Sequence, residues 1–389
     1  MQSIHLNTAG AGLASQQTLS RMSAYLQHEA QLGPYEAERL HADEIARVRQ
    51  HLCALLDAPD STRMALFDSG TRAWNSAVDA LAPFPAGSRV WTSPYEYAGN
   101  LLSLQSLAHR DGLKLEMIPL CADGELDLGW MAREADSSVR LVSLVHVPSC
   151  CGRVMPVEEV GELLRRVAPA ALYAVDACQS VGQLPVSVRA IGCDLLTAAG
   201  RKFLRGPRGT GFAVVGARWM DVIGSHPLDL HAAEVDSLHL RRMTDTSARR
   251  LELSEYHVAA LLGLGVAAEQ ALGFDMRPVH SLFDRLQRGL RELPGVSLIA
   301  PSGRHSGIVS FHHQMWPAEA VVHHLRQWGI NAWQISGRHT PLYLLPRGID
   351  SAVRLSVHVT NSESDVETAV NALSALGAHR HTPLMEVAK

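Results

Sequence analysis

Seven short runs of β-branched and other apolar residues alternate with helical patterns along the first two-thirds of the chain, and this alternation constrains the fold most. The runs span residues 63–67, 89–92, 114–118, 140–147, 171–175, 194–198 and 211–215. Most of them are followed by Gly, Ser or Pro and then by a helix, which is typical of a mainly parallel sheet with crossover helices on both faces. We therefore predict an α/β fold with a mainly parallel seven-stranded sheet, in which ligands bind at the carboxyl ends of the strands.

The last third of the chain is organised differently. A helical pattern over residues 254–271 leads into a region where helices at 279–293, 317–328 and 363–376 alternate with strands near 307–312 and 352–358. This order predicts a smaller α+β domain packed beside the first, with the N-terminal dozen residues returning to the cleft between them. We expect a large domain over residues 13–262 and a small domain formed by residues 1–12 and 263–389.

Composition excludes several classes of protein. The net charge is −4, and the Lys and Arg residues are scattered, which argues against a nucleic-acid surface. The N-terminus has neither a basic start nor an apolar run, and no apolar stretch approaches the roughly 18 residues that span a bilayer. We therefore expect a cytoplasmic protein without membrane contact. The six cysteines form no C-x-x-C pair and are expected to be free thiols, and no spacing of His, Cys or carboxylates predicts a metal site.

A lysine and an aspartate follow two successive predicted strands. Lys202 lies just past the strand at 194–198, and Asp176 ends the strand at 171–175. An enzyme that holds pyridoxal phosphate (PLP) needs this pair, because the lysine amine condenses with the cofactor aldehyde and the carboxylate keeps the pyridine nitrogen protonated. The pair predicts an enzyme that acts on amino acids.

The phosphate of such a cofactor requires backbone N–H groups and cationic or hydroxyl donors. Residues 68–74 supply a strand-to-helix turn that contains Ser69, Gly70 and Thr71, and Thr71 is the first candidate. Arg201, next to Lys202, is expected to add a charge-assisted donor, although an exposed surface arginine is the alternative interpretation.

The pyridine ring requires a flat face and a donor to its phenolic oxygen. Tyr95 and Tyr97 both follow the strand at 89–92, and we favour Tyr97 as the stacking residue. Gln179 and Ser149 are the candidate donors to the phenolic oxygen. Their alternative roles are a helix cap for Gln179 and a turn for Ser149.

Six sequence blocks together resemble a known family. They lie at residues 7–12, 69–71, 96–100, 176–179, 200–211 and 354–358. The blocks are similar to the fold-type I, class V aminotransferase and cysteine desulfurase superfamily of PLP enzymes. This resemblance implies PLP bound to Lys202, with Asp176 at the pyridine nitrogen, Gln179 at the phenolic oxygen, and Thr71 and Arg201 at the phosphate.

The same resemblance implies how the substrate and a partner subunit are placed. Arg354 falls where the family binds the α-carboxylate of the substrate, a task that suits a bidentate guanidinium, whereas the alternative is a surface-strand arginine. Asn7 and Tyr35 are further candidates for substrate binding. The family also implies a homodimer with active sites near the subunit interface, which residues around Tyr35 or 251–257 are expected to cross.

Departures from the family pattern narrow the reaction. Desulfurases carry a cysteine on a mobile loop of the small domain, but residues 335–342 contain none, and no cysteine follows Cys193. Persulfide formation by that route would need a cysteine from the other domain.

Two further departures concern the contacts to the phosphate. Ala199 replaces a hydroxyl donor to the phosphate. Glu255 occupies the segment that reaches the neighbouring subunit's phosphate, so Ser254 or His257 must compensate or the contact is absent.

Residues 28–37, 251–255 and the block from Arg354 are most similar to the ergothioneine-biosynthesis C–S lyases and the isopenicillin N epimerase-like branch that contains them. The resemblance implies a C–S (β-)lyase acting on a cysteine conjugate or sulfoxide, with Lys202 as proton carrier. An aminotransferase, an epimerase or a decarboxylating deaminase of natural-product biosynthesis is the alternative. A PLP-fold binding protein without activity is a further alternative, against which the joint presence of Lys202, Asp176 and Arg354 argues.

Overall fold

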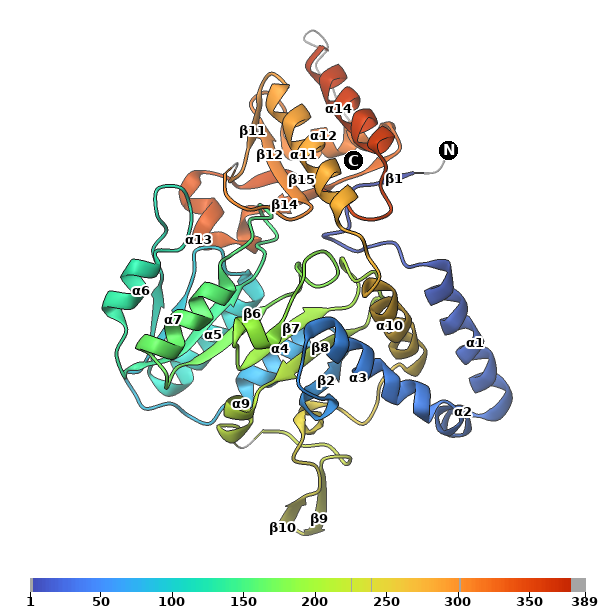
Figure 1. Cartoon of the computed structure of the whole chain (residues 1–389), viewed down its shortest axis with the longest axis vertical. Coiled ribbons are helices and arrows are strands. Elements are labelled where there is room, and N and C mark those ends of the chain that lie inside the picture. Colours follow the sequence, from blue (N-terminus) through green and yellow to red (C-terminus); the bar gives the residue numbers. More distant parts are fainter. Residues whose placement is uncertain (1–2, 225, 239, 301, 379–389) are drawn as a thin grey trace, which may run out of the picture.

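The computed structural model describes residues 3–224, 226–238, 240–300 and 302–378. Its centre is a seven-stranded sheet in the order β2-β8-β7-β6-β5-β3-β4 (Figure 1). The strands are β2 (Met64–Phe67), β3 (Arg89–Thr92), β4 (Lys114–Met117), β5 (Val139–Val145), β6 (Leu172–Asp176), β7 (Leu195–Ala199) and β8 (Gly211–Val215). Only β8 runs antiparallel to its neighbours, β2 and β7. The predicted α/β fold with a mainly parallel seven-stranded sheet is confirmed.

Helices cover both faces of this sheet. The helices of this part of the chain are α1 (Gln16–Leu32), α2 (Pro34–Leu40), α3 (Ala42–Leu56), α4 (Gly70–Asp79), α5 (Ala98–Asp111), α6 (Leu128–Glu134), α7 (Val157–Val167), α8 (Val188–Ile191), α9 (Ala217–Asp221) and α10 (Val258–Ala271). Helices α1 and α2 lie outside the layers on the sheet, because α1 packs against α10 and α2 against α1 (Figure 1). Successive residues of β6 point to opposite faces: Leu172 and Ala174 pack with α4, α5 and α9, whereas Tyr173 and Val175 pack with α3, α7 and α10. Burial on both sides explains why these strands are apolar throughout their length.

A second, four-stranded antiparallel sheet lies above the first in Figure 1, in the order β11-β12-β15-β14. Its strands are β11 (Val296–Leu298), β12 (Ile308–His313), β14 (Trp333–Ser336) and β15 (Ser351–Ser356), and its helices are α11 (Arg277–Glu292), α12 (Ala318–Gln327), α13 (Pro341–Leu344) and α14 (Glu363–Ala378). The sequence predicted β12 and β15, which are largely buried, but not the short, more exposed β11 and β14.

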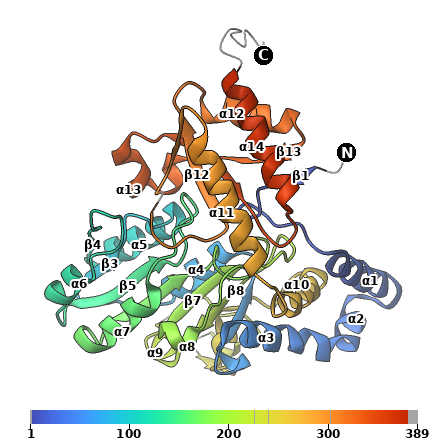
Figure 2. The same ribbon diagram turned by 45° about the horizontal axis from the view of Figure 1, so that its top comes forward.

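The N-terminal residues join the second sheet's side of the molecule. Strand β1 (Ile4–His5) pairs in parallel with β13 (Ile330–Asn331), as Figure 2 shows, and Asn7 forms a bridge with Ser356 of β15. The chain then crosses toward the first sheet, where the Gly12 N–H donates to the Arg201 carbonyl over 2.7 Å. The domain boundaries at 12/13 and 262/263 remain predictions.

Two details differ from the expected elements. Helix α10 begins at Val258 and not at 254, because residues 252–257 form a loop and the side chain of His257 caps the helix by accepting from the Ala260 N–H. A hairpin of β9 (Ala233–Ser237) and β10 (Leu240–Met243), which the sequence did not predict, projects from the bottom of Figure 1. In the part of the chain that the structure describes, no helix combines the length and the apolar character needed to cross a membrane.

Candidate active site

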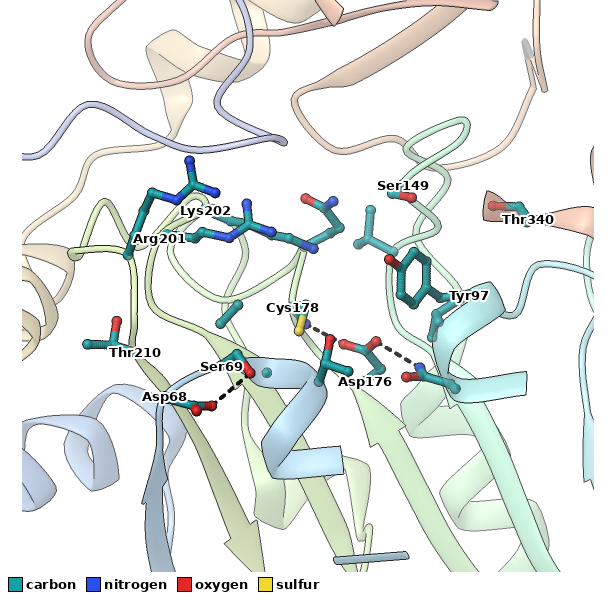
Figure 3. A pocket seen from close by; sticks show the side chains of 18 of the residues that line it. Asp68, Ser69, Tyr97, Ser149, Asp176, Cys178, Arg201, Lys202, Thr210 and Thr340 are labelled. Atoms are coloured by element: carbon teal, nitrogen blue, oxygen red, sulfur yellow. Dashed lines mark hydrogen bonds between the residues drawn. The ribbon is translucent and has the colours of Figure 1, made fainter. Parts of the chain in front are cut away.

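A cavity of about 260 Å³ lies at the carboxyl ends of the central strands (Figure 3). It brings together nine of the predicted site residues: Ser69, Gly70, Thr71, Tyr97, Ser149, Asp176, Gln179, Arg201 and Lys202. It is also lined by residues that sequence reasoning did not assign: Asp68, Asn100, Cys178, Arg208, Gly209, Thr210 and Thr340. Segments from seven parts of the chain therefore converge on one small volume.

Lys202 stands on a tight loop after β7. Backbone hydrogen bonds fix this loop, including those from the Gly206 N–H to the Gly200 carbonyl (2.8 Å) and from the Arg205 N–H to the Lys202 carbonyl (2.9 Å). Burial lowers the pKa of the Lys202 amine, and the charges of Arg201 and Arg354 lower it further, although Cys178 and Asp176 oppose this shift. A lowered pKa increases the neutral fraction of the amine, which is the form that attacks an aldehyde.

Asp176 is the last residue of β6, and both of its carboxylate oxygens accept hydrogen bonds. Oδ1 accepts from the backbone N–H of Cys178 (2.8 Å) and Oδ2 accepts from the side-chain nitrogen of Asn100 (2.9 Å), bonds that are drawn in Figure 3. Each oxygen of a carboxylate has two acceptor sites, so these two bonds leave acceptor capacity for a ligand in the cavity. The carboxylate is thus held in one orientation while it keeps the capacity to accept from a pyridine N–H.

Behind Asn100 lies a second carboxyl group, that of Glu96, which is fully buried. The Asn100 side-chain nitrogen donates to Glu96 Oε1 (3.0 Å) as well as to Asp176. Burial raises the pKa of the Glu96 carboxyl, the charge of Asp176 raises it further, and the hydrogen bond from Asn100 opposes this. Glu96 lies just before Tyr97, the N-cap of α5, and Asn100 lies in the first turn of that helix; this spacing of four residues is the sequence signal that would have pointed to the pair.

The start of α4 forms the opposite end of the cavity. Ser69 caps this helix by accepting from the Arg72 N–H (3.1 Å), and its hydroxyl donates to Asp68 (3.0 Å). The free N–H groups of a helix start suit a phosphate. A Cβ atom placed on Gly211, the first residue of β8, would lie 2.2 Å from the Ser69 carbonyl carbon, so glycine is required for this close approach. Asp68 adds a negative charge here that the sequence reasoning did not consider.

Arg201 is half-buried, and its guanidinium donates to the backbone carbonyl of Gly10. The N-terminal segment therefore packs directly on this side chain. The alternative of an exposed surface arginine is not what the structure shows. Its phosphate role stays a prediction.

The two tyrosines after β3 differ in their exposure to solvent. Tyr95 is buried: its hydroxyl donates to the Gly124 carbonyl (2.9 Å), and its ring lies 4.3 Å from that of Tyr343. Tyr97 is 38% exposed and lines the cavity. Burial raises the pKa of the Tyr97 phenol, so its ring is uncharged at neutral pH. Both tyrosines line the cavity, and Tyr97 is the more exposed of the two.

Gln179 and Ser149 occupy the cavity wall in ways that the sequence did not foresee. The Gln179 side-chain nitrogen donates to the Ala9 carbonyl (3.1 Å), so this side chain fastens the N-terminal segment and caps no helix. The backbone carbonyl of Ser149 accepts from Arg354 Nη1 (3.2 Å). Their predicted bonds to a phenolic oxygen remain predictions.

Arg354 lies on β15 and is 6% exposed, which rules out the surface-strand alternative. Besides Ser149, it approaches the Asn7 side-chain oxygen over 3.5 Å, and its Nε has no partner among the described residues. Burial lowers the pKa of Arg354 to about 10, so the group is still cationic at neutral pH. A buried cation with an unpaired donor fits a carboxylate ligand.

Besides Arg354 and Asn7, two other predicted residues do not line this cavity. His257 lines a neighbouring cavity of about 360 Å³, which shares Asp68, Gly209 and Thr210 with the first. Tyr35 is 77% exposed on α2 and lines neither cavity. A single chain therefore does not bring Tyr35 or His257 to the cavity that contains Lys202.

The segment after β14 reaches the cavity with Thr340. Cys178 is the only cysteine among the described residues that line the cavity. Burial raises the pKa of the Cys178 thiol, and the nearby charge of Asp176 adds to this rise. The cavity wall thus contains a protonated thiol and no thiolate nucleophile.

The donor set as a whole fits PLP. An amine with a lowered pKa, a carboxylate with free acceptor sites, a helix start and an exposed aromatic face line one cavity. The unpaired Nε of the buried Arg354 lies beside this cavity, near Ser149.

Comparisons with known proteins agree with this chemistry. The family model described as Aminotransferase class-V matches residues 4–368. The chain is 32% identical over 300 residues to a probable cysteine desulfurase of Pyrococcus abyssi, covering 75% of this chain and 73% of that protein. The apo structure of a cysteine desulfurase from Thermococcus onnurineus NA1 superposes with a TM-score of 0.87 at 25% identity, covering 96% of this chain and 94% of that one. The cystine C–S lyase C-DES, solved with cysteine persulfide, has the same fold, with a TM-score of 0.84 at 21% identity and coverage of 96% and 97%.

Proposed function

The chain belongs to the class V aminotransferase family and is a PLP-dependent enzyme, and from this premise we propose that it cleaves the carbon–sulfur bond of a cysteine conjugate or sulfoxide. The proposed reaction converts an S-substituted cysteine and water into a thiol, pyruvate and ammonium. With a sulfoxide substrate the leaving group is a sulfenic acid. Atoms balance in both cases without an oxidant or reductant.

One observation carries this proposal. A desulfurase needs a nucleophilic thiol at the cavity to accept the sulfur of the substrate, and the part of this chain that the structure describes has no such thiol there. Residues 335–342 carry no cysteine, and Thr340 is the residue of this segment that reaches the cavity. Cys178 lines the cavity, but the raised pKa of its thiol leaves it protonated at neutral pH. An elimination needs no such nucleophile, because the sulfur departs with its own substituent.

The chain's own residues supply binding and proton transfer. When bound, PLP supplies an electron sink for the pair left at the substrate α-carbon. Lys202 is the proposed base that takes the α-proton at Nζ, and its lowered pKa favours the neutral amine that a base requires.

Other residues are proposed to bind the cofactor and the substrate. Asp176 is proposed to hold a proton on the pyridine nitrogen, and Arg354 to bind the substrate carboxylate. Thr71, the α4 start and Arg201 are proposed to bind the phosphate, Tyr97 to stack on the ring, and Gln179 or Ser149 to contact its phenolic oxygen.

Product analysis tests the proposal. The protein, reconstituted with PLP, is incubated with S-alkyl cysteines, their sulfoxides and cysteine itself, and pyruvate, ammonia and alanine are quantified. We expect equal amounts of pyruvate and ammonia, and none with Lys202→Ala. Alanine from cysteine would contradict the proposal in favour of a desulfurase. Amino transfer to a keto acid, racemised substrate or released CO₂ would indicate an aminotransferase, an epimerase or a decarboxylating deaminase.

A homodimer in the cytoplasm is the proposed state of the enzyme, following the family resemblance. One surface supports the dimer: Tyr256, 41% exposed, donates to Glu38 of α2 over 2.7 Å, which places the 252–257 loop beside α2 with its exposed Tyr35 and Leu40. These are the two segments predicted to cross the subunit interface. Light scattering on the PLP-loaded protein, compared with Tyr35→Arg, tests this: a monomeric wild type would contradict it.

A further inference from the structure

The Glu96 carboxyl group is fully buried although it does not line the cavity. Burying a carboxyl group is costly unless hydrogen bonds replace its water. The burial of Glu96 therefore requires hydrogen-bond donors around it, and a reason why a carboxyl group stands at this position.

Four donors surround Glu96. Oε1 accepts from the Asn100 side-chain nitrogen (3.0 Å) and from the Tyr97 backbone N–H (3.0 Å). Oε2 accepts from the hydroxyls of Thr92 (3.0 Å) and Ser143 (2.9 Å). Every acceptor site of the two oxygens is used, which holds the carboxylate in one position.

The bond to Asn100 links this carboxylate to the cavity. An amide nitrogen has two N–H groups, and those of Asn100 divide between Glu96 Oε1 and Asp176 Oδ2. Two acceptors on the same side require the nitrogen, and not the oxygen, of the amide to face them. Without Glu96, the Asn100 amide would be free to rotate and to place its oxygen against the Asp176 carboxylate.

We propose that Glu96 is a positioning residue, which acts through Asn100 to fix the Asp176 carboxylate in the orientation that holds a proton on the pyridine nitrogen of PLP. The inference rests on the role proposed above for Asp176. It does not depend on which bond of the substrate the enzyme cleaves. Glu96 touches neither the cavity nor its contents.

Three substitutions separate this role from simple packing. Glu96→Ala removes the acceptor for Asn100. Glu96→Asp keeps the charge but withdraws the carboxylate by one methylene. Glu96→Gln can keep an oxygen toward Asn100 and the Tyr97 N–H while its nitrogen donates to the hydroxyls of Thr92 and Ser143, which also accept.

Two measurements report on the bound cofactor independently of turnover. They are the Kd of the apoprotein for PLP and the pH at which the visible absorption of bound PLP changes. We expect Glu96→Ala and Glu96→Asp to raise the Kd by about tenfold, the loss expected for a hydrogen bond to a charged group. We expect the same variants to shift the pH of the absorption change by about half a unit or more. Glu96→Gln should restore most of both values.

Asn100→Ala completes the experiment. If Glu96 acts through Asn100, Glu96→Ala in the Asn100→Ala background produces no further change in either readout. The matched control is Asp194→Asn, which alters a buried, hydrogen-bonded carboxylate at the opposite end of β7 from Lys202 and should move stability alone.

Additive effects of Glu96→Ala and Asn100→Ala would overturn the proposal, and so would unchanged PLP binding and absorption in a folded Glu96→Asp. If Glu96→Ala does not fold, Glu96→Asp and Glu96→Gln decide the matter alone. A wild-type protein that binds no PLP would refute the proposed cofactor site itself, which distinguishes that failure from the failure of this inference.

Discussion

Arg354 Nη1 donates a hydrogen bond to the backbone carbonyl of Ser149 over 3.2 Å. A strand of the four-stranded sheet thereby contacts the loop that follows β5 of the seven-stranded sheet. The guanidinium is oriented by this bond, while its buried Nε is left without a partner among the described residues. A carboxylate bound here would meet a fixed cation.

Replacing this arginine should weaken substrate binding and leave the cofactor in place. We expect Arg354→Gln to raise KM by about 100-fold, as for the loss of one partner from a buried ion pair, with a smaller effect on kcat. Steady-state kinetics measure the split, and the visible absorption of bound PLP serves as the control. An unchanged KM would contradict the assigned role.

Lys202 should be the one lysine that PLP modifies. The chain has only three lysines, Lys114, Lys202 and Lys389. Reduction of the PLP-loaded protein with borohydride, followed by peptide mass spectrometry, should place the label on Lys202. The visible absorption should vanish in Lys202→Ala and persist in the matched variant Lys114→Ala. Label on Lys114 in the wild type would contradict this prediction.

The lowered pKa of Lys202 also has a consequence for the stability of the apoprotein. In the unfolded chain this amine returns to its ordinary pKa of 10.5, so between the folded and unfolded pKa values the unfolded state binds more protons. Stability therefore rises with pH through that window. We expect Lys202→Met to raise the Tm of the apoprotein at pH 7, with the difference shrinking as the pH approaches 10. A difference that grew with pH would contradict the sign.

Cys178 should be dispensable for turnover, because its raised thiol pKa keeps it protonated. We expect Cys178→Ser to retain kcat within about threefold, which corresponds to less than 1 kcal/mol. Product analysis should give pyruvate as before. A loss of activity by orders of magnitude, together with a persulfide detected on Cys178 in the wild type, would instead indicate sulfur transfer to this residue.

Gly211 should be required for PLP binding although it carries no side chain. A Cβ atom at this position would meet the Ser69 carbonyl carbon at 2.2 Å and displace the turn before α4. We expect Gly211→Ala to raise the Kd for PLP by about tenfold or more, the order of magnitude of one lost charge-assisted hydrogen bond. Gly87→Ala is the control: its φ of 79° makes alanine strained there, but nothing lies within 4 Å. Equal effects of the two variants on PLP binding would contradict the steric argument.

The sequence predicted the parts of the site that follow directly from strand ends. Asp176 and Lys202 each come after an apolar run, and parallel strands bring their carboxyl ends to one edge. The short edge strands β11 and β14 and the β9–β10 hairpin were not predicted, because exposed strands of three to five residues leave little apolar pattern.

Side-chain contacts between segments far apart in the sequence could not be predicted from the residue pattern. The link from Glu96 through Asn100 to Asp176 joins the start of α5 to the end of β6, and its geometry depends on packing. The same holds for the Gln179 side-chain nitrogen, which donates to the Ala9 carbonyl, and for the Arg201 guanidinium, which donates to the Gly10 carbonyl. Both side chains line the cavity, but their partners in this structure come from the N-terminal segment.

The position of that segment sets an order of events during synthesis on the ribosome. The Ala9 N–H donates to the Ser356 hydroxyl, 347 residues later, and Ile4 pairs with Ile330. A nascent chain can therefore assemble the seven-stranded sheet long before its own first residues find their partners. Chains that stop before β15 also lack Arg354 and leave the segment over Arg201 without its anchor. Until β15 has been synthesised, the cavity lacks both Arg354 and the anchored N-terminal segment, so the full set of candidate site residues can assemble only after that strand exists.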